Sequence, residues 1–246
     1  MRLLASDTLE FCADRDPNNT KYAILSHTWG SDEEEVNHQA MCNPTGEIRE
    51  RPGYKKLVKF AEIAQGLGHP YIWIDTCCID KSSSAELTEA INSMYHWYQA
   101  SQVCIVYLAD CVIQKDEPAA ERKAIFRKAR WFTRGWTLQE LLAPKNIRYY
   151  SSSWDLVSID ISLMMEMTHI PERVLRSNNY AQDVSVAQKM SWASHRRTKR
   201  PEDMAYCLMG TFGVNMPLLY GEGEKAFIRL QEEIIRRSND YTIFLW

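Results

Sequence analysis

Residues 71–110 read YIWIDTCCIDKSSSAELTEAINSMYHWYQASQVCIVYLAD, and this stretch decides the fold. "YIWID" (71–75) and "VCIVYLAD" (103–110) are short apolar runs, the second rich in β-branched residues, and both predict strands. Between them, Ser83 and Glu86 have the spacing of a capping box and apolar residues follow at helical intervals, which predicts a helix. Strands that alternate with helices need crossover connections, and a parallel sheet covered on both faces is the economical solution.

The same alternation extends in both directions along the chain. Upstream, "KYAILSHTW" (21–29) predicts a strand, and residues 53–67 predict an amphipathic helix. Downstream, "RGWTLQELLAP" (134–144) predicts a short helix ended by its proline, and "NIRYYSS" (146–152) predicts a fourth strand. We therefore predict an α/β fold with a central, mostly parallel sheet flanked by helices, in which four segments are neighbouring strands: 22–26, 71–75, 103–108 and 146–150.

After residue 155 the pattern becomes helical. The helical segments are "SIDISLMMEM", "SVAQKMSWAS", "PEDMAYCLMGTF" and "GEKAFIRLQEEIIRRS". Neither an internal repeat nor a linker-like composition is evident. We predict a single domain over residues 1–246, with an α/β core at 20–152 and a helical C-terminal elaboration at 153–246.

Composition restricts the class of protein. The 246 residues are 45% hydrophobic and 25% charged, which is typical of a globular chain with a sizeable core. A net charge of -3 gives no general attraction to nucleic acid or to an anionic membrane, although charges gather in "DEEE" (32–35) and "HRRTKR" (195–200). No apolar run reaches the roughly 18 residues of a membrane span, and the N-terminus lacks a signal-peptide core. We expect a cytoplasmic protein.

The seven cysteines are an odd number without regular spacing, which favours reduced thiols over a disulfide framework. Adjacent Cys77 and Cys78 cannot form half of a CxxC zinc site, and no second pair with ligand spacing follows. We expect neither a metal site nor a cofactor.

Polar residues gather where the predicted strands end. Ser26, His27 and Trp29 follow the first strand, and Asp75 and Cys77 follow the second. Ligands of open α/β sheets bind beyond the carboxyl ends of the strands. We predict a ligand site at this edge.

Five motifs carry a resemblance to a known family. They are "MRLLASDTLEF", "YAILSHTWG", "YIWIDTCCIDK", "RGWTLQELLAP" and "MSWASHRRTKRPEDMAYCLMGTFGVNMPLLYGEGEKAFIRLQEEII". Together they resemble the heterokaryon incompatibility (HET) domain of fungi over nearly the whole chain. The resemblance implies a cell-death effector of nonself recognition, of the kind carried at the N-terminus of larger receptor-like proteins. The nucleotide-binding oligomerisation module and the repeats of such proteins are not in this sequence, so we expect a longer parent chain.

A more distant resemblance concerns residues 20–152. Their strand-helix order and the run "RGWTLQEL" are similar to the Toll/interleukin-1 receptor (TIR) domain, several members of which cleave NAD with a glutamate on the corresponding helix. Carried over to this sequence, that catalytic residue is Glu140. "SHTWG" departs from the usual end of the first TIR strand, so substrate contacts there are expected to differ. The resemblance makes NAD the candidate substrate.

The chemistry of the residues is compatible with that assignment. Trp136 lies four positions before Glu140, on the same face of a helix. Cleavage of the nicotinamide-ribose bond expels a neutral leaving group, so one carboxylate that stabilises the oxocarbenium-like state is enough. Substrate contacts are expected from the indoles of Trp29, Trp131 and Trp136 and, at the diphosphate, from Arg134 or His27.

Each candidate also has a structural interpretation. Glu140 could lie on the helix surface or pair with Arg130 or Arg134, the indoles could be core residues, and His27 could be a structural histidine. Three further residues, Asp75, Asp80 and Lys81, could organise a turn. The pair Glu202-Asp203 suits a first helical turn, and "HRRTKR" before it predicts internal salt bridges.

Other functions compete with NAD cleavage. No GxSxG elbow or Walker loop is present, and "GEGEKAF" (221–227) lacks the required ending. Cys77 or Cys78 with His27 forms a possible nucleophile pair at the same edge. The main alternative is a non-enzymatic module that signals by homotypic assembly through its apolar helix faces. Self-association is also the expected switch of the enzyme.

Overall fold

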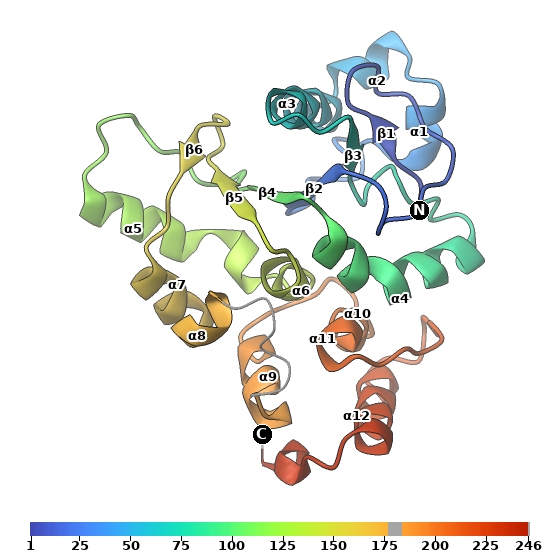
Figure 1. The fold of residues 1–246 in the computed structure, drawn as a ribbon, viewed down its shortest axis with the longest axis vertical. Helices are drawn as coiled ribbons and strands as arrows, with labels where there is room; N and C mark the ends of the chain where they lie inside the picture. The colour runs from blue at the N-terminus through green and yellow to red at the C-terminus, as the bar shows by residue number, and fades with distance from the viewer. Residues whose placement is uncertain (177–183, 246) are drawn as a thin grey trace.

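The computed structural model describes residues 1–176 and 184–245, which form a sheet flanked by helices (Figure 1). The sheet has six strands in the order β1-β3-β2-β4-β5-β6. Their bounds are β1 Leu4–Ala5, β2 Tyr22–His27, β3 Tyr71–Trp73, β4 Val103–Tyr107, β5 Ile147–Tyr150 and β6 Leu156–Val157. The four predicted strands are β2 to β5, and their adjacency is confirmed.

The sheet is mixed. The three inner pairings, β2 with β3, β2 with β4 and β4 with β5, are parallel. Each edge adds a two-residue strand in antiparallel orientation, β1 beside β3 and β6 beside β5. The sequence analysis missed both edge strands because two residues are too few to show an alternating pattern. Strand β3 also ends at Trp73, earlier than predicted, so Asp75 begins the loop that follows.

The helices of the first half enclose the sheet. Figure 1 shows α3 on one face and α4 and α6 on the other. Their bounds are α1 His38–Cys42, α2 Gly46–Glu50, α3 Pro52–Gly66, α4 Ser84–Ala100, α5 Ala119–Lys128 and α6 Thr137–Leu142, with a 3-10 turn at Arg130–Thr133 before α6. Strand residues that alternate in direction therefore meet different helices on the two faces.

The predicted capping box of α4 is half formed. The Ser83 side chain accepts a hydrogen bond from the Glu86 amide, as expected. The Glu86 carboxylate instead accepts from the Asp80 amide at 2.8 Å and from the Arg2 guanidinium at 2.7 Å. An arginine brought in from the N-terminus offers a charged donor, which makes a stronger bond than a neutral amide.

The chain after β6 is helical. Its helices are α7 Ile161–Thr168, α8 Glu172–Leu175, α9 Val186–Ala193, α10 Asp203–Tyr206, α11 Met209–Phe212 and α12 Lys225–Arg237, and a 3-10 turn, Tyr241–Phe244, follows. The segment 201–212 was predicted as one helix but forms two short ones, α10 and α11. A Cβ added at Gly210 would overlap the side chain of Tyr95, so this glycine lets α11 approach α4 closely. None of the helices within residues 1–176 and 184–245 has the length and apolar character needed to cross a bilayer.

Residues 195–203, which we call the strap, join the helical part to the start of α6. The Gly135 amide donates to the Arg197 carbonyl at 2.8 Å, and the Arg197 amide donates to the Thr133 carbonyl at 2.7 Å. These bonds form a parallel β-bridge between Arg134 and Arg197. A Cβ at Gly135 would overlap the Thr198 side chain, so the approach needs glycine. The strap is therefore held against the start of α6.

Candidate functional site

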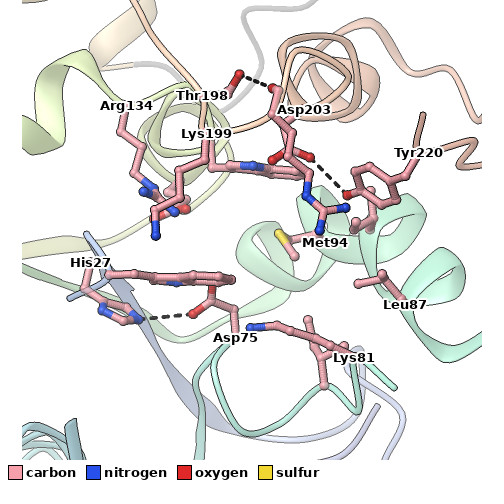
Figure 2. Close-up of a pocket in the computed structure, with 16 residues that line it drawn as sticks. His27, Asp75, Lys81, Leu87, Met94, Arg134, Thr198, Lys199, Asp203 and Tyr220 are labelled. Atoms are coloured by element: carbon pink, nitrogen blue, oxygen red, sulfur yellow. Dashed lines mark hydrogen bonds and ion pairs between the residues drawn. The ribbon is translucent and has the colours of Figure 1, made fainter. Parts of the chain in front are cut away.

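A cavity of about 310 Å³ lies where the loops after β2 and β3, helices α4 and α6, and the strap meet (Figure 2). A volume of this size suits a small-molecule ligand. The residues that line it are His27, Trp29, Asp75, Ile79, Lys81, Leu87, Ile91, Met94, Arg134, Trp136, Glu140, Thr198, Lys199, Arg200, Asp203 and Tyr220.

Glu140 reaches this cavity from α6, a helix whose six residues are all buried. Its Oε2 accepts a hydrogen bond from the Ser26 hydroxyl, and the Ser26 oxygen accepts one from Trp131 Nε1 at 2.7 Å. Ser26 belongs to β2, and its bond to Glu140 shows that its side chain points toward α6. The chain Trp131, Ser26, Glu140 thus fixes the carboxyl group at the cavity wall.

The environment of Glu140 favours its neutral form. Burial and, to a smaller extent, the negative charge of Asp75 raise its pKa, while the Ser26 hydroxyl, the Arg134 charge and the Tyr98 hydroxyl lower it; the net result is a rise from the ordinary 4.5 to about 8. At neutral pH this pKa favours the protonated carboxyl. Among residues 1–176 and 184–245, Glu140 forms no ion pair, and Arg130, once its possible partner, pairs with Asp110 at 3.5 Å.

Asp75 has the opposite character. Its Oδ1 accepts a hydrogen bond from His27 Nε2 at 3.1 Å and its Oδ2 accepts one from Trp29 Nε1 at 2.9 Å. Burial alone would raise the pKa of Asp75, but the His27 bond and the nearby charges of Lys81 and Arg134 outweigh it and hold the pKa well below its usual range. The cavity therefore contains one permanent carboxylate and one carboxyl group with a proton, a contrast that is frequent at catalytic sites.

A buried chain of charges fixes His27. Lys56 Nζ lies 3.0 Å from His27 Nδ1 and 2.6 Å from Glu35 Oε1. Lysine has no acceptor, so Nδ1 accepts and the imidazole proton is on Nε2, directed at Asp75. Burial and the Lys56 charge both lower the pKa of His27, which keeps it neutral. Both ring nitrogens are occupied, and His27 is therefore not free to bind a diphosphate as predicted.

The three indoles have different surroundings. Lys81 Nζ lies 3.8 Å and the Arg134 guanidinium 5.4 Å from the centroid of the Trp29 ring. In this structure the indole therefore contacts two cations, whereas the prediction was that it stacks on a ring of the substrate. Trp136 is partly buried and lines the cavity. Trp131 is fully buried and supports Ser26 from behind.

Three predicted contact residues lie behind the cavity wall. Ser26, Cys77 and Trp131 are buried and do not line the cavity, and Ser26 and Trp131 support Glu140 through hydrogen bonds. The Cys77 thiol has a pKa well above its ordinary value because of the Cys78 contact and burial. A thiol that cannot ionise is a poor nucleophile, and the possible Cys-His pair is not supported.

In the turn after β3, Asp80 and Lys81 have different roles. The Asp80 carboxylate accepts from the Ser82 amide at 3.0 Å and organises the turn, as its structural interpretation stated. Lys81 instead extends into the cavity.

The strap supplies a wall that the sequence analysis did not find. Its residues Thr198, Lys199, Arg200 and Asp203 line the cavity. The internal salt bridges expected between "HRRTKR" and Glu202-Asp203 were wrong within the described part of the chain. Glu202 accepts from the Gly221 and Gly223 amides, and Asp203 accepts from the Tyr220 hydroxyl at 3.0 Å. The unusual density of basic residues was the available signal, but nothing local connects it to α6.

Arg196 joins the two walls from inside the protein. Its guanidinium is buried and Nη1 donates to the Arg134 carbonyl at 3.0 Å and to the Thr137 hydroxyl at 2.9 Å. The start of α6 and the strap therefore share one buried donor. The sequence analysis did not predict that Arg196 is buried, because a charged side chain in a basic run is usually exposed to solvent.

Comparison with known proteins finds two matches. Residues 22–121 match the family model described as "Heterokaryon incompatibility protein (HET)". A curated relative, the vegetative incompatibility protein HET-E-1 of Podospora anserina, is 46% identical over 219 residues, which is 87% of this chain and 16% of the relative. These matches support a heterokaryon incompatibility domain. No solved structure matches, and similarity to TIR domains is not shown.

Proposed function

We propose that this domain is a cell-death effector of fungal nonself recognition and that it hydrolyses NAD at the nicotinamide-ribose bond, with Glu140 as the catalytic carboxylate. The name of the relative supports the biological role. One observation carries the chemical part. Glu140 lines the cavity together with Trp136, and the ionised Asp75 and several cations lie on the surrounding wall.

The reaction would proceed with little proton chemistry. The bond between the ribose C1′ and the ring nitrogen breaks, its electron pair returns to the ring, and nicotinamide leaves as a neutral molecule. Water adds to the cationic ribosyl carbon and releases one proton. An ionised Glu140 stabilises the cation in the transition state and accepts that proton.

The raised pKa of Glu140 fits this cycle. A substrate that carries a positive ring charge, placed beside the carboxyl group, favours its ionised form and lowers its pKa. Binding of NAD therefore switches the carboxyl from its resting neutral form to the form that the reaction needs. Before substrate enters, the neutral form limits the cost of a buried charge.

A non-enzymatic assembly module is the second candidate. Ile228 and Ile235 are exposed and lie seven residues apart on α12, on one side of the helix. Exposed apolar side chains at helical spacing favour contact with another protein surface. In the enzymatic proposal, self-association acts as the switch: concentration or fusion to an oligomeriser raises turnover per molecule.

Incubation of concentrated protein with NAD, followed by chromatographic separation of nicotinamide, tests the enzyme. The parent should release nicotinamide, and Glu140→Gln should lower the rate by at least about 100-fold because the developing charge loses its counter-charge. Glu47→Gln, an exposed glutamate on α2, is the matched control and should keep the parent rate. Equal rates for the parent and Glu140→Gln, or cell killing by a correctly folded Glu140→Gln, would favour the assembly module.

A further inference from the structure

Four cations line the cavity without a carboxylate partner. Lys81 follows β3, Arg134 precedes α6, and Lys199 and Arg200 belong to the strap. Within residues 1–176 and 184–245, none of the four forms an ion pair. Like charges that converge on one space repel each other, and an anionic ligand relieves that repulsion.

The strap holds its two cations in a defined place. The β-bridge at Arg197 fixes the backbone before them, and the Thr198 hydroxyl donates to the Arg200 carbonyl at 2.6 Å. The Arg200 guanidinium also lies 4.5 Å from the centroid of the Tyr220 ring. These contacts orient the charges and leave them un-neutralised.

The nearest acids are bonded to other groups. The Glu202 carboxylate accepts from the Gly221 amide at 2.8 Å and from the Gly223 amide at 3.0 Å. Asp203 accepts from the Tyr220 hydroxyl. The charges of Arg200 and Arg134 act on Asp203 through space, but neither carboxylate forms an ion pair with the basic run among the described residues.

The cations enter the cavity from two walls. In Figure 2, Lys199 and Arg134 extend into the cavity from one side, and Lys81 comes from the opposite wall beside Asp75. Trp29, which contacts both Lys81 and Arg134, holds their charges without neutralising them. A single phosphate is compact and would contact the cations of one wall. Two linked phosphates are longer, and their oxygens can contact cations on both walls.

We propose that Lys81, Arg134, Lys199 and Arg200 form a diphosphate subsite, so that the substrate class is compounds with two linked phosphates, and that Lys199 and Arg200 determine this specificity. The inference rests on the proposed function for the reacting end of the substrate, which lies at Glu140. Binding of the diphosphate does not depend on hydrolysis.

Calorimetric titration with inorganic pyrophosphate and with orthophosphate tests the subsite directly. The parent should bind pyrophosphate at least about tenfold more tightly than orthophosphate, and added salt should weaken binding. Lys199→Ala/Arg200→Ala should lose about tenfold or more in pyrophosphate affinity. Arg122→Ala/Lys128→Ala removes the same charge from exposed positions on α5, outside the cavity, and should change affinity by less than about twofold.

Thermal unfolding shows whether the exposed substitutions leave the fold intact. Equal affinity for the two anions, or an equal loss in the strap variant and its control, would overturn the subsite. Kinetics provides a second test: the strap variant should raise KM for NAD about tenfold with little change in kcat, and should leave cleavage of nicotinamide riboside, which has no phosphate, unchanged.

The outcomes separate the two proposals. A parent protein that does not cleave NAD but prefers pyrophosphate in a strap-dependent way contradicts the proposed function and supports the subsite. A parent that cleaves NAD through Glu140 but shows no such preference contradicts the subsite alone.

Discussion

The two walls of the cavity are built on different principles. On the sheet side, Glu35, Lys56, His27 and Asp75 form a buried chain in which every charge has a partner. On the strap side, Lys199 and Arg200 have no carboxylate partner among the described residues, and backbone bonds hold the segment in place. One wall is therefore held in place by paired charges, which set the protonation of its groups. The other wall is held in place by backbone bonds, and its two cations can interact with a ligand.

The pH dependence of NAD cleavage gives the largest expected effect on the sheet side. The proposed reaction uses the ionised form of Glu140, and burial raises the pKa of this carboxyl to about 8. The value of kcat/KM should rise by about tenfold per pH unit well below that value and become level above it, so about fiftyfold separates pH 6 from pH 8. Initial rates at low NAD across this range provide the measurement, and a profile that falls with rising pH would contradict the assignment.

The stability of Glu140→Gln provides the next effect. The folded-state pKa of about 8 lies above the ordinary 4.5, so the unfolded chain loses this proton first and the parent becomes less stable as pH rises between these values. Glutamine has no such loss. Near pH 4.5 the two proteins should be similarly stable, and at pH 7 the variant should be more stable by about 2–3 kcal/mol.

Denaturant unfolding at both pH values tests this difference. Other groups that titrate are shared by the two proteins and cancel in the comparison. A stability difference that does not change between pH 4.5 and pH 7 would show that Glu140 is ionised in the resting site.

A third substitution, Arg196→Met, tests the buried contact that joins the strap to the start of α6. Arg196→Met keeps the length and apolar volume of the side chain but removes the donors to the Arg134 carbonyl and the Thr137 hydroxyl. We expect a loss of about 1–3 kcal/mol in unfolding free energy, because a buried acceptor is left without its partner. KM for NAD should also rise. Arg197→Met, an exposed neighbour, is the control and should be nearly neutral in stability.

Asp75→Asn should produce the smallest shift. The Asp75 charge raises the pKa of Glu140, so its removal should move the midpoint of the pH profile to lower pH, by less than about one unit. An unchanged midpoint would show that the two carboxyl groups do not interact.

The four inner strands of the sheet could be predicted from the sequence. Apolar runs and the helix between them placed β2 to β5, and the shared edge of parallel strands placed Glu140 near His27 and Asp75. The sequence analysis did not separate Ser26 from His27. They are adjacent in β2 and point to opposite faces, where α6 and α3 lie respectively, so one supports Glu140 and the other Asp75.

The strap side could not be found in the same way. Its position depends on a bridge between Arg134 and Arg197, which are far apart in the chain, and on the close approach that Gly135 permits. Neither feature leaves a periodic pattern. The roles of Glu202 and Asp203 likewise depend on Gly221, Gly223 and Tyr220, partners that are specified by the tertiary fold.

The bridge between the strap and α6 has a consequence for the order of biosynthesis. A ribosome releases the sheet residues, up to β6, before it has made the strap and Tyr220. Chains fold from the N-terminal end as they emerge, so the sheet can form while its ligand cavity still lacks a wall. The nascent chain thus carries Glu140, Lys81 and Arg134 before Lys199 and Arg200 exist. If the proposed NAD cleavage needs the complete cavity, unfinished copies should be inactive until this junction closes.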